Sequence, residues 1–426
     1  MFADIAQHIA HFIAFLLSIL RNYLYRDRLS APMTSRDVLA DVVEGWAADI
    51  AKERIVARPV MDDVDASFDA EEVTVVKGVR RAGKTFVLYE VHRRRGGLYV
   101  NFEDERLADF GLEDFDKLLD MRPKALYLDE VQRVEGWERF AHRAHRKVKI
   151  YVTGSNSRLL SSDYAKALVG RTKSHTVRPL GYGEFLAFKG AEVGRPSLEE
   201  YMRTGGFPRI VLTGDVSLAA EYLDRILYRD ILGSADVRHP EALKTLATYL
   251  LSNVGKEFSF RSLRDLTGIK SENTVKDYVG HLRGAYLVEV LNRFDPSLKV
   301  QESYGKKAYA TDPSFARLGL RRGRDDGRIL ENVVFLHLAA KSPSMFYAKD
   351  AKEADFLLCD GLRPLRVVNV TLEAEEGDTL RREIESLGHF MRKYGVPGEL
   401  VSMYPSKVPE GVEARLAHRY LAGLDN

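Results

Sequence analysis

The chain has 426 residues, of which 45% are apolar and 30% charged, as is usual for globular proteins, and at about 100–200 residues per domain it has room for two to four domains. Because 64 Lys and Arg nearly balance 62 Asp and Glu, the net charge of +2 excludes a bulk attraction to nucleic acid or membranes, and such binding would need local patches. Cys359 is the only cysteine, which excludes an internal disulfide and a cysteine zinc site and fits a reducing cytoplasm.

The first 20 residues are unusually apolar, but the longest run without a charged residue or histidine, Phe12–Leu20, is too short to span a bilayer. No basic region precedes this run and no small-residue cleavage site follows it, so we do not expect a secretory signal. The nearby Arg21, Arg26 and Arg28 would suit a helix on a membrane surface. A second methionine, Met33, favours an N-terminal extension, to which we assign residues 1–34 without a clear membrane partner.

After an amphipathic helix at 35–50, strands and helices alternate up to residue 180. The acidic stretch 61–72 is expected to approach the first strand along the surface. Strands are expected at 73–77, 98–102, 125–129, 148–153 and 174–180, and helices at 84–94, 112–119, 137–146 and 158–168. This alternation predicts an α/β fold over residues 35–180, with a parallel, doubly wound sheet that is covered on both faces.

The first strand runs directly into the motif G-x-x-x-x-G-K-T at residues 78–85. Its glycines let the backbone curl where a side chain would collide with phosphate oxygens, and the loop amides and the next helix then face the phosphates. Lys84 is expected to reach the β- and γ-phosphates, and the Thr85 hydroxyl to bind Mg²⁺. A glycine-rich turn without a ligand is the alternative. The candidate nucleotide-binding residues are Gly78, Val79, Arg80, Arg81, Ala82, Gly83, Lys84 and Thr85.

A second motif, Ala-Leu-Tyr-Leu-Asp-Glu at 125–130, places two acids at the end of an apolar strand. In a P-loop sheet this edge faces the nucleotide. Asp129 is therefore expected to hold Mg²⁺, and Glu130 to orient the attacking water, because positioning and charge placement dominate phosphoryl transfer. An extra strand between the two motifs and a glutamate beside the metal-binding aspartate are typical of the ATPase branch of P-loop proteins.

Polar residues also follow the next strand, in Val-Thr-Gly-Ser-Asn-Ser at 152–157. In ATPases of this branch a polar residue at this place touches the γ-phosphate, and the strand register favours Ser155 over Asn156. A helix N-cap is an alternative role for both residues, and the two roles are compatible.

Several arginines are candidates for contacts with phosphate. Arg171 could act as a finger on the ATP of a neighbouring subunit, which would make the protein a homo-oligomer, or it could balance a helix dipole. Arg209 is a weaker candidate for a second sensor. Arg80 and Arg81 lie in the phosphate loop itself, where they could contact phosphate or pair with acids elsewhere, and the sequence does not choose between these roles.

The remaining chain predicts three further modules. Helices at 199–203, 217–232 and 240–251 predict a helical lid over residues 181–250. Helices at 260–267 and 272–283, followed by strands at 286–291 and 307–310, are typical of a winged helix-turn-helix, which we assign to residues 251–315. A last block, 316–426, has the pattern helix, three strands, helix.

These motifs occur in one order: G-V-R-R-A-G-K-T, L-Y-L-D-E-V-Q at 126–132, V-T-G-S at 152–155, G-R-T at 170–172, R-P-L-G-Y-G-E-F-L at 178–186, T-G-G-F-P at 204–208 and Y-R-D at 228–230. In this order the chain resembles a family of archaeal and bacterial AAA+-like ATPases over most of residues 40–310. The resemblance implies ATP rather than GTP, and a lid followed by a winged helix.

The C-terminal domain of that family resembles a restriction-nuclease fold, and residues 316–426 match its pattern in part. Glu331 matches the glutamate of its helix, and Glu353-Ala354-Asp355-Phe356 match its first motif strand. In the later strand, however, Asn369 stands where the family has a metal-binding glutamate and Thr371 where it has a lysine. An amide is a poor substitute for a carboxylate on Mg²⁺, and no cation remains to activate water, so we expect an inactive domain.

The sequence therefore predicts a cytoplasmic ATPase that uses ATP and Mg²⁺ and couples hydrolysis to a conformational change on DNA or a protein partner. Lys270, Lys276, His281 and Arg283 on or next to the second winged-helix helix favour DNA. Basic runs at 142–149 and 317–328 point the same way, whereas Glu272 and Asp277 on the same helix would repel phosphate. A regulatory switch with little turnover, or a DNA-binding protein with a secondary ATPase, remains an alternative.

Overall fold

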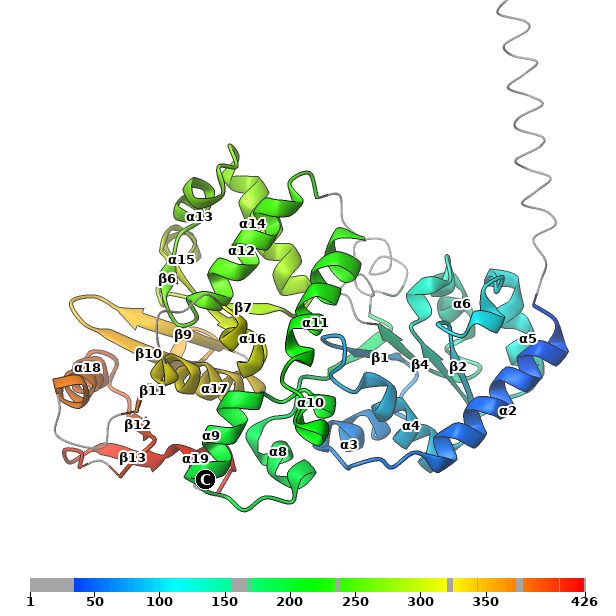
Figure 1. Ribbon diagram of the computed structural model, residues 1–426, viewed down its shortest axis with the longest axis horizontal. Coiled ribbons are helices and arrows are strands. Elements are labelled where there is room, and N and C mark those ends of the chain that lie inside the picture. The colour runs from blue at the N-terminus through cyan, green and yellow to red at the C-terminus, as the bar shows by residue number, and fades with distance from the viewer. Residues whose placement is uncertain are drawn as a thin grey trace, which may run out of the picture.

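In the part of the chain that the structure describes, two five-stranded sheets lie at opposite ends of the molecule, with helices between them (Figure 1). The computed structural model describes residues 34–154, 168, 170–233, 237–319, 325–342, 344–372, 378–405 and 407–424. The predicted extension therefore lies outside the described residues, apart from its last position. No helix within the described ranges is long and apolar enough to cross a lipid bilayer.

The first sheet is parallel and has the strand order β2-β3-β4-β1-β5. Alternate residues of β3 belong to different hydrophobic clusters, with Leu126 and Leu128 on one face and Tyr127 on the other, so both faces are buried. Strand β4 lies between β1 and β3, which confirms the predicted P-loop fold of the ATPase branch. The strands are β1 (Val73–Lys77), β2 (Leu98–Asn101), β3 (Ala125–Asp129), β4 (Lys149–Gly154) and β5 (Thr172–Thr176).

Helices cover both faces of this sheet (Figure 1). One face packs against α2 (Arg36–Lys52), α5 (Phe115–Asp120) and α6 (Trp137–Ala144). The other face packs against α3 (Pro59–Asp65) and α4 (Lys84–Arg95). Short 3₁₀ turns lie in the connections: η1 (Glu105–Leu107), η2 (Leu112–Asp114) and η3 (Val131–Arg133).

Two segments of the first module differ from the prediction. The stretch expected to run along the surface contains α3, whose Met61 and Val64 are buried, and its first residue, Pro59, is well suited to a helix start. Strand β5 begins and ends earlier than expected, because its polar residues, which are exposed or half-exposed, form the edge of the sheet and show no apolar pattern. The helix expected at 158–168 lies outside the described residues, except for Leu168.

The predicted lid is helical, and it contains two helices that the sequence did not indicate, α8 and α10. Helix α10 begins at Pro208, the last residue of the T-G-G-F-P motif. A Cβ at Gly206 would lie 2.1 Å from the Leu180 carbonyl oxygen, so this stretch is a tight junction between packed elements. The helices are α8 (Tyr182–Lys189), α9 (Arg195–Thr204), α10 (Pro208–Thr213), α11 (Leu218–Arg225), the π-helix η5 (Ile226–Leu232) and α12 (Pro240–Ser252).

The next module contains the two expected helices, α13 and α14, which are joined by a turn at Gly268 with φ +70°. Beside them lies an antiparallel sheet with the strand order β6-β8-β7, in which β6 was not predicted. Its elements are β6 (Glu257–Phe258), α13 (Phe260–Thr267), α14 (Glu272–Gly284), β7 (Val288–Asn292), α15 (Leu298–Ser303), β8 (Lys306–Ala310) and α16 (Pro313–Leu318).

The C-terminal module is a mixed sheet with the strand order β13-β12-β11-β10-β9. Strands β9 to β11 are antiparallel, and β11 to β13 are parallel. Helix α17 precedes the sheet and α18 packs against β11 and β12. The elements are α17 (Asp326–Lys341), β9 (Ser344–Lys349), β10 (Glu353–Asp360), β11 (Arg363–Thr371), α18 (Asp378–Tyr394), β12 (Gly398–Ser402), β13 (Val412–Leu416) and α19 (Ala417–Leu421).

Candidate functional site

The loop between β1 and α4 has a shape that requires its two glycines. Gly78 has φ +146°, and a Cβ there would lie 2.0 Å from the Val177 carbonyl oxygen. Gly83 has φ +96° and precedes α4 without a side chain that caps the helix. The first backbone N–H groups of α4 therefore have no side-chain hydrogen-bond acceptor at Gly83 and point toward the loop. This arrangement favours the binding of an anion.

Lys84 is buried at the start of α4 and folds back over this loop. Its Nζ donates hydrogen bonds to the carbonyl oxygens of Gly78 and Val79, both at 3.1 Å. Burial lowers the pKa of the Lys84 ammonium, while the nearby Glu130 and Asp129 carboxylates act against this shift. The ammonium is thus held where it can meet a phosphate bound by the loop.

Asp129, at the end of β3, is buried and accepts hydrogen bonds from the hydroxyl groups of neighbouring elements. The Thr85 hydroxyl donates to Oδ2 at 2.8 Å, and the Tyr99 hydroxyl donates to the same oxygen at 2.5 Å. The Thr153 hydroxyl donates to Oδ1. The structure therefore brings together Thr85 and Asp129, the two residues that we had selected as Mg²⁺ ligands.

The oxygen atoms of Thr85 and Asp129 suit a hard cation such as Mg²⁺, most of whose ligands would come from outside the protein. A hydroxyl and one carboxylate are oxygen ligands of the kind that Mg²⁺ prefers, and in nucleotide sites the remaining positions belong to phosphate and water. Among the described residues, no group of three or more His, Cys, Asp or Glu that could hold a metal by itself is found.

Glu130 follows Asp129 with φ +53°, a left-handed conformation that is uncommon for glutamate. Its backbone N–H donates to the Thr153 hydroxyl at 3.0 Å, and the Gln132 side-chain amide donates to its Oε2 at 2.6 Å. Burial raises the pKa of the Glu130 carboxyl, which favours a role in accepting or sharing a proton.

These groups line one cavity of about 460 Å³ between the first sheet and the lid. Its polar residues include Lys84, Thr85, Asp129 and Glu130. Its apolar residues include Ile55 and Val56 before α3, Met61 in α3, Phe86 in α4, and Phe188, Pro208 and Leu212 in the lid. Such a combination suits a ligand with a flat apolar part and a strongly anionic part.

The candidate arginines have separate positions. Arg81, with φ +71°, and Arg209 line the cavity. Arg80 also lines it and pairs with Asp230. Arg171 lies away from the cavity, in a shallow hollow with Glu71 and Glu72. Ser155 and Asn156, which we had selected as phosphate sensors, lie outside the described residues.

Four residues at this edge of the sheet were missed in the sequence: Tyr99, Asn101, Glu103 and Thr153. Tyr99 and Thr153 contact Asp129, and Asn101 and Glu103 line the cavity. The carboxyl ends of parallel strands meet at one edge of a sheet. Asn101 and Glu103 lie at the end of the second strand and Thr153 lies two places before Ser155, so the sequence did contain a signal for these three residues. Nothing in the local sequence distinguishes Tyr99 from an ordinary core tyrosine.

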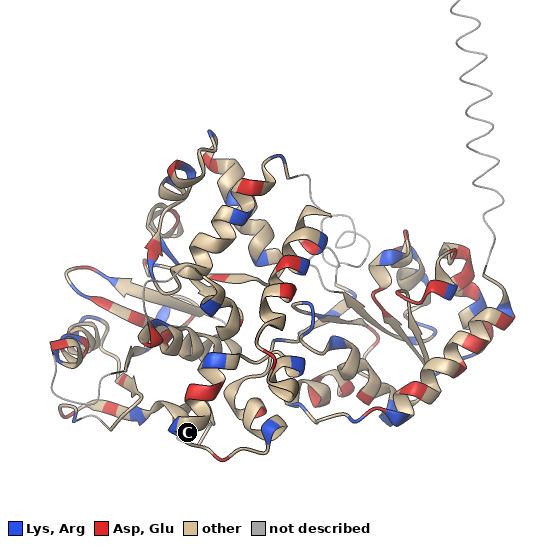
Figure 2. Ribbon diagram, viewed as in Figure 1, with Lys and Arg blue, Asp and Glu red and all other residues tan. Residues whose placement is uncertain are grey.

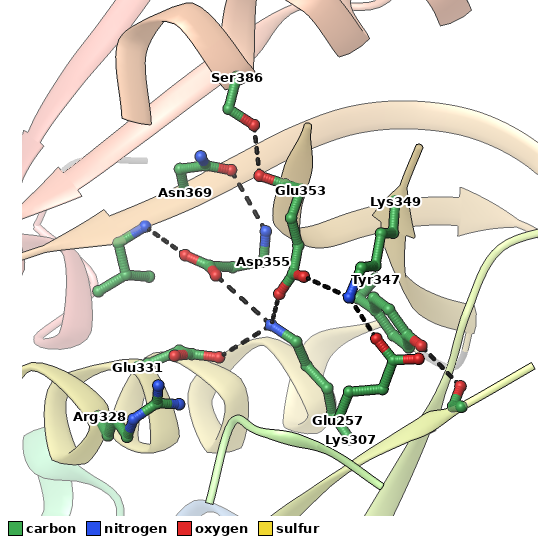
Figure 3. Close-up of polar contacts among 12 residues, drawn as sticks. Glu257, Lys307, Arg328, Glu331, Tyr347, Lys349, Glu353, Asp355, Asn369 and Ser386 are labelled. Carbon is green, nitrogen blue, oxygen red and sulfur yellow. Dashed lines mark hydrogen bonds and ion pairs between the residues drawn. The ribbon is translucent and has the colours of Figure 1, made fainter. Parts of the chain in front are cut away.

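A second polar cluster joins β8 to the C-terminal module (Figure 3). The Lys307 Nζ lies 2.8 Å from Glu353 Oε1, 3.5 Å from Glu331 Oε1 and 3.7 Å from Asp355 Oδ1. Our expectation that no cation remains here was wrong, because a lysine distant in the sequence supplies one. Its ammonium lies among the carboxylates that a nuclease would use for a metal, so these residues do not fit a metal site.

Asn369 links this cluster to α18. Its Oδ1 accepts a hydrogen bond from the Asp355 N–H at 3.3 Å, and its Nδ2 donates to Glu383 Oε2 at 2.7 Å. Burial raises the pKa of Glu331 and of Glu383 to about 7 each. Asn369 therefore connects the Asp355 backbone to Glu383 through hydrogen bonds and adds no charge to the cluster.

The basic segments that favoured DNA differ in their availability. Lys149 is buried and donates to the backbone of Ala70 and Glu72, and the Arg317 guanidinium contacts Met202 O and Asp326. The cations of α14 and of Lys270 just before it are exposed or half-exposed. Acidic and basic positions are interspersed over the whole ribbon (Figure 2). The α14 region is therefore the better candidate for a basic contact surface.

The strand order, the phosphate loop and the acids at the end of β3 define the class of protein: an α/β P-loop protein of the ATPase branch. Comparison with known families agrees, since residues 70–186 match the model of an AAA domain and residues 195–325 match a domain of unknown function. The chain is 32% identical to the uncharacterized protein MJ1544 of Methanocaldococcus jannaschii over 361 residues, which are 76% of this chain and 80% of that protein. It belongs to the family of this archaeal protein.

Other similar proteins are more distant. An uncharacterized protein of Haemophilus influenzae is 29% identical over 319 residues, 68% of this chain and 80% of its own. Among solved structures, the Walker-type ATPase PabY2304 of Pyrococcus abyssi is 15% identical, with a TM-score of 0.42 over 63% of this chain and 99% of its own. AMPPCP-bound DnaA from Aquifex aeolicus is 17% identical, with a TM-score of 0.29 over 54% and 89%.

Proposed function

We propose that the chain binds ATP with Mg²⁺ in the cavity between the first sheet and the lid and hydrolyses the β–γ bond. The observation that carries this proposal is the convergence of Lys84, Thr85, Asp129 and Glu130 on one cavity, from the loop after β1 and from the end of β3. When bound, Mg²⁺ neutralises charge on the phosphates. Thr85 and Asp129 are the residues that would hold it.

The protein groups then have distinct roles. Lys84 and the loop amides bind the β- and γ-phosphates, and the apolar side of the cavity receives the adenine. Glu130 orients the attacking water, since its carboxylate is fixed by Gln132 and its backbone by Thr153. We assign to Ser155 a contact with the γ-phosphate. Arg171 lies outside this cavity, which favours a role at the ATP of a neighbouring copy.

ATP turnover by the full chain tests this function. In Glu130→Gln we expect turnover to fall at least about 100-fold with ATP affinity largely retained, because a general base contributes about 10²–10⁴-fold to rate. In Lys84→Ala we expect ATP affinity itself to fall. Glu135→Gln, an exposed acid five residues further along the chain, is the matched control and should hydrolyse ATP normally. Normal turnover by Glu130→Gln would contradict hydrolysis at this site; ATP binding by a wild type that shows no turnover would favour a regulatory switch.

We further propose that hydrolysis is coupled to a conformational change in the helix-turn-helix module and that its partner is duplex DNA. Support comes from the exposed cations on and next to α14, which could contact phosphates while the helix lies in a major groove. Lys276 is paired with Glu272 at 3.4 Å, an exposed ion pair that a phosphate could replace.

A further inference from the structure

Arg80 is the residue of the phosphate loop whose role the sequence left open, and it is held by an acid from another module. Its Nε lies 3.3 Å from both carboxylate oxygens of Asp230. Both side chains are nearly buried, with 12% and 5% of their surface exposed. The pair joins residues that are 150 positions apart in the sequence, and it lies at the cavity proposed for ATP.

Asp230 belongs to η5, the π-helical segment of the lid between α11 and α12. The Gly233 N–H donates to the Tyr228 carbonyl oxygen at 2.9 Å, five residues back, as in a π-helix. Such segments are rare and less stable than an α-helix of the same length. A return of η5 to α-helical hydrogen bonds would turn Asp230 relative to Arg80.

The residue next to Asp230 makes a second charged contact with the cavity. The Arg229 guanidinium lies 2.7 Å from Glu103 Oε1, and Glu103 follows the end of β2 and lines the cavity. Adjacent residues of η5 are thus attached to the phosphate loop and to the edge of the sheet. Both contacts are between opposite charges, so their strength depends on the charge that the cavity contains.

A bound triphosphate would change the balance at Arg80. Its γ-phosphate brings negative charge close to the Asp230 carboxylate, and a guanidinium binds phosphate oxygens in the same forked geometry in which it binds a carboxylate. Asp230 and the γ-phosphate therefore compete for Arg80. When Arg80 turns to the phosphate, the burial of Asp230 is no longer offset by this cation, which favours movement of η5.

We propose that Arg80 and Asp230 form a nucleotide-dependent link between the phosphate loop and η5, in which the γ-phosphate of ATP takes Arg80 from Asp230 and releases η5. The link rests on the proposed function. Asp230 acts as a positioning residue in it. Because α12, the next helix of the lid, packs against α13 and α14 of the helix-turn-helix module, the link is the route by which ATP, and not ADP, changes the position of that module.

Hydrogen exchange of the full chain tests this link, with no nucleotide, with MgADP and with Mg²⁺ plus the non-hydrolysable analogue AMPPCP. We expect both nucleotides to slow exchange in residues 78–85. We expect AMPPCP alone to speed exchange in residues 226–232, by about fivefold or more, the scale of coupling between linked sites.

Arg80→Ala should exchange rapidly at 226–232 without nucleotide and show no further response. Asp230→Asn should do the same and bind AMPPCP at least as tightly as the wild type, because it keeps Arg80 free for phosphate.

The control is Glu184→Gln, which breaks another partly buried ion pair near the cavity, between Glu184 and Arg58 at 2.7 Å. In this variant, exchange at residues 226–232 should still respond to AMPPCP. If the response were lost, it would reflect a general loosening of the structure around the cavity, and the link would be overturned. Protection of 78–85 in the wild type with unchanged or slower exchange at 226–232 would overturn the link alone. If neither nucleotide protects 78–85, the link fails together with ATP binding.

Discussion

Asp129 illustrates how single residues of this cavity depend on neighbours that carry no charge. The carboxylate accepts hydrogen bonds from the hydroxyl groups of Thr85, Tyr99 and Thr153, which lie on three different elements. Thr153 also accepts the Glu130 N–H at 3.0 Å. One hydroxyl group therefore positions both the candidate metal ligand and the candidate base.

Replacement of Thr153 by valine keeps the shape of the side chain and removes this hydroxyl. Hydrogen bonds to charged groups contribute about 1.5–3 kcal/mol, so we expect turnover to fall about tenfold or more, with a higher Mg²⁺ concentration needed for half-maximal rate. Steady-state ATP hydrolysis over a Mg²⁺ series measures both quantities.

The matched control is Thr74→Val on the neighbouring strand. The Thr74 hydroxyl is buried, and no hydrogen-bond partner for it exists in the described residues. Its loss should leave turnover and Mg²⁺ dependence near those of the wild type. A Thr153→Val protein that behaves like Thr74→Val would show that the Thr153 hydroxyl does not position the catalytic groups.

At the scale of elements, α14 combines a buried and an exposed side. Val275, Tyr278, Val279 and Leu282 are buried and hold the helix against its module. Lys276 and Arg283, and Lys270 just before the helix, are exposed, but Glu272 and Asp277 also lie on α14. Binding of DNA through α14 would therefore consist of a few phosphate contacts and should weaken steeply with salt.

An electrophoretic shift assay with duplex DNA over a salt series tests α14. We expect a complex at low salt, and a smaller salt dependence in the double variant Lys270→Ala, Arg283→Ala, by about one unit of log–log slope for each phosphate that the variant no longer binds. Lys173→Ala, an exposed lysine of β5, is the control and should bind DNA like the wild type. The absence of a shift even at low salt would exclude duplex DNA as the partner.

At the scale of the whole molecule, Lys307 connects modules. It reaches from β8 into a cluster of carboxylates on α17 and β10, where it is almost completely buried (Figure 3). The neighbouring carboxylates, which outweigh the effect of burial, raise the pKa of its ammonium, so Lys307 stays charged over the whole physiological range. Its charge offsets the burial of these carboxylates and so stabilises the C-terminal module against its neighbour.

Removal of this charge should destabilise the protein in a pH-dependent way. For Glu331 and Glu383 the folded-state pKa of about 7 lies above the ordinary value of 4.5, so the folded form binds more protons between these values and its stability falls as the pH rises through them. In Lys307→Met we expect a loss of about 3–5 kcal/mol at pH 8, as for other broken buried ion pairs, and a smaller loss near pH 6, where the carboxyls take up protons.

Thermal unfolding at pH 6 and pH 8 measures this effect. The control is Lys352→Met, which breaks the exposed ion pair with Glu385 at 2.8 Å and should change the melting temperature little at either pH. A Lys307→Met protein that melts like the wild type at pH 8 would show that the cluster does not need this cation.

Much of the nucleotide site could be predicted because its parts are local in the sequence. Residues 73–85 contain the strand, the two glycines and the helix start, and each is determined by nearest neighbours: an unbroken run of β-branched residues, tolerance of positive φ, and the helical period. Strand β3 and its terminal acids were predicted for the same reason. Helix α3 was not predicted and the bounds of the edge strand β5 were displaced, since their short, polar patterns lack a periodic signal.

The sequence by itself thus determined the class of protein and the phosphate loop, because the alternation of strands with helices and the conformations of glycine follow from local sequence patterns. Only the tertiary structure decided which charges meet. Arg80 could have faced phosphate or any acid, and packing of η5 placed Asp230 beside it. Thr371 implied the loss of a cation, yet packing of β8 against the C-terminal sheet supplied Lys307. Ion pairs between distant segments depend on how modules pack, and no local pattern records that packing.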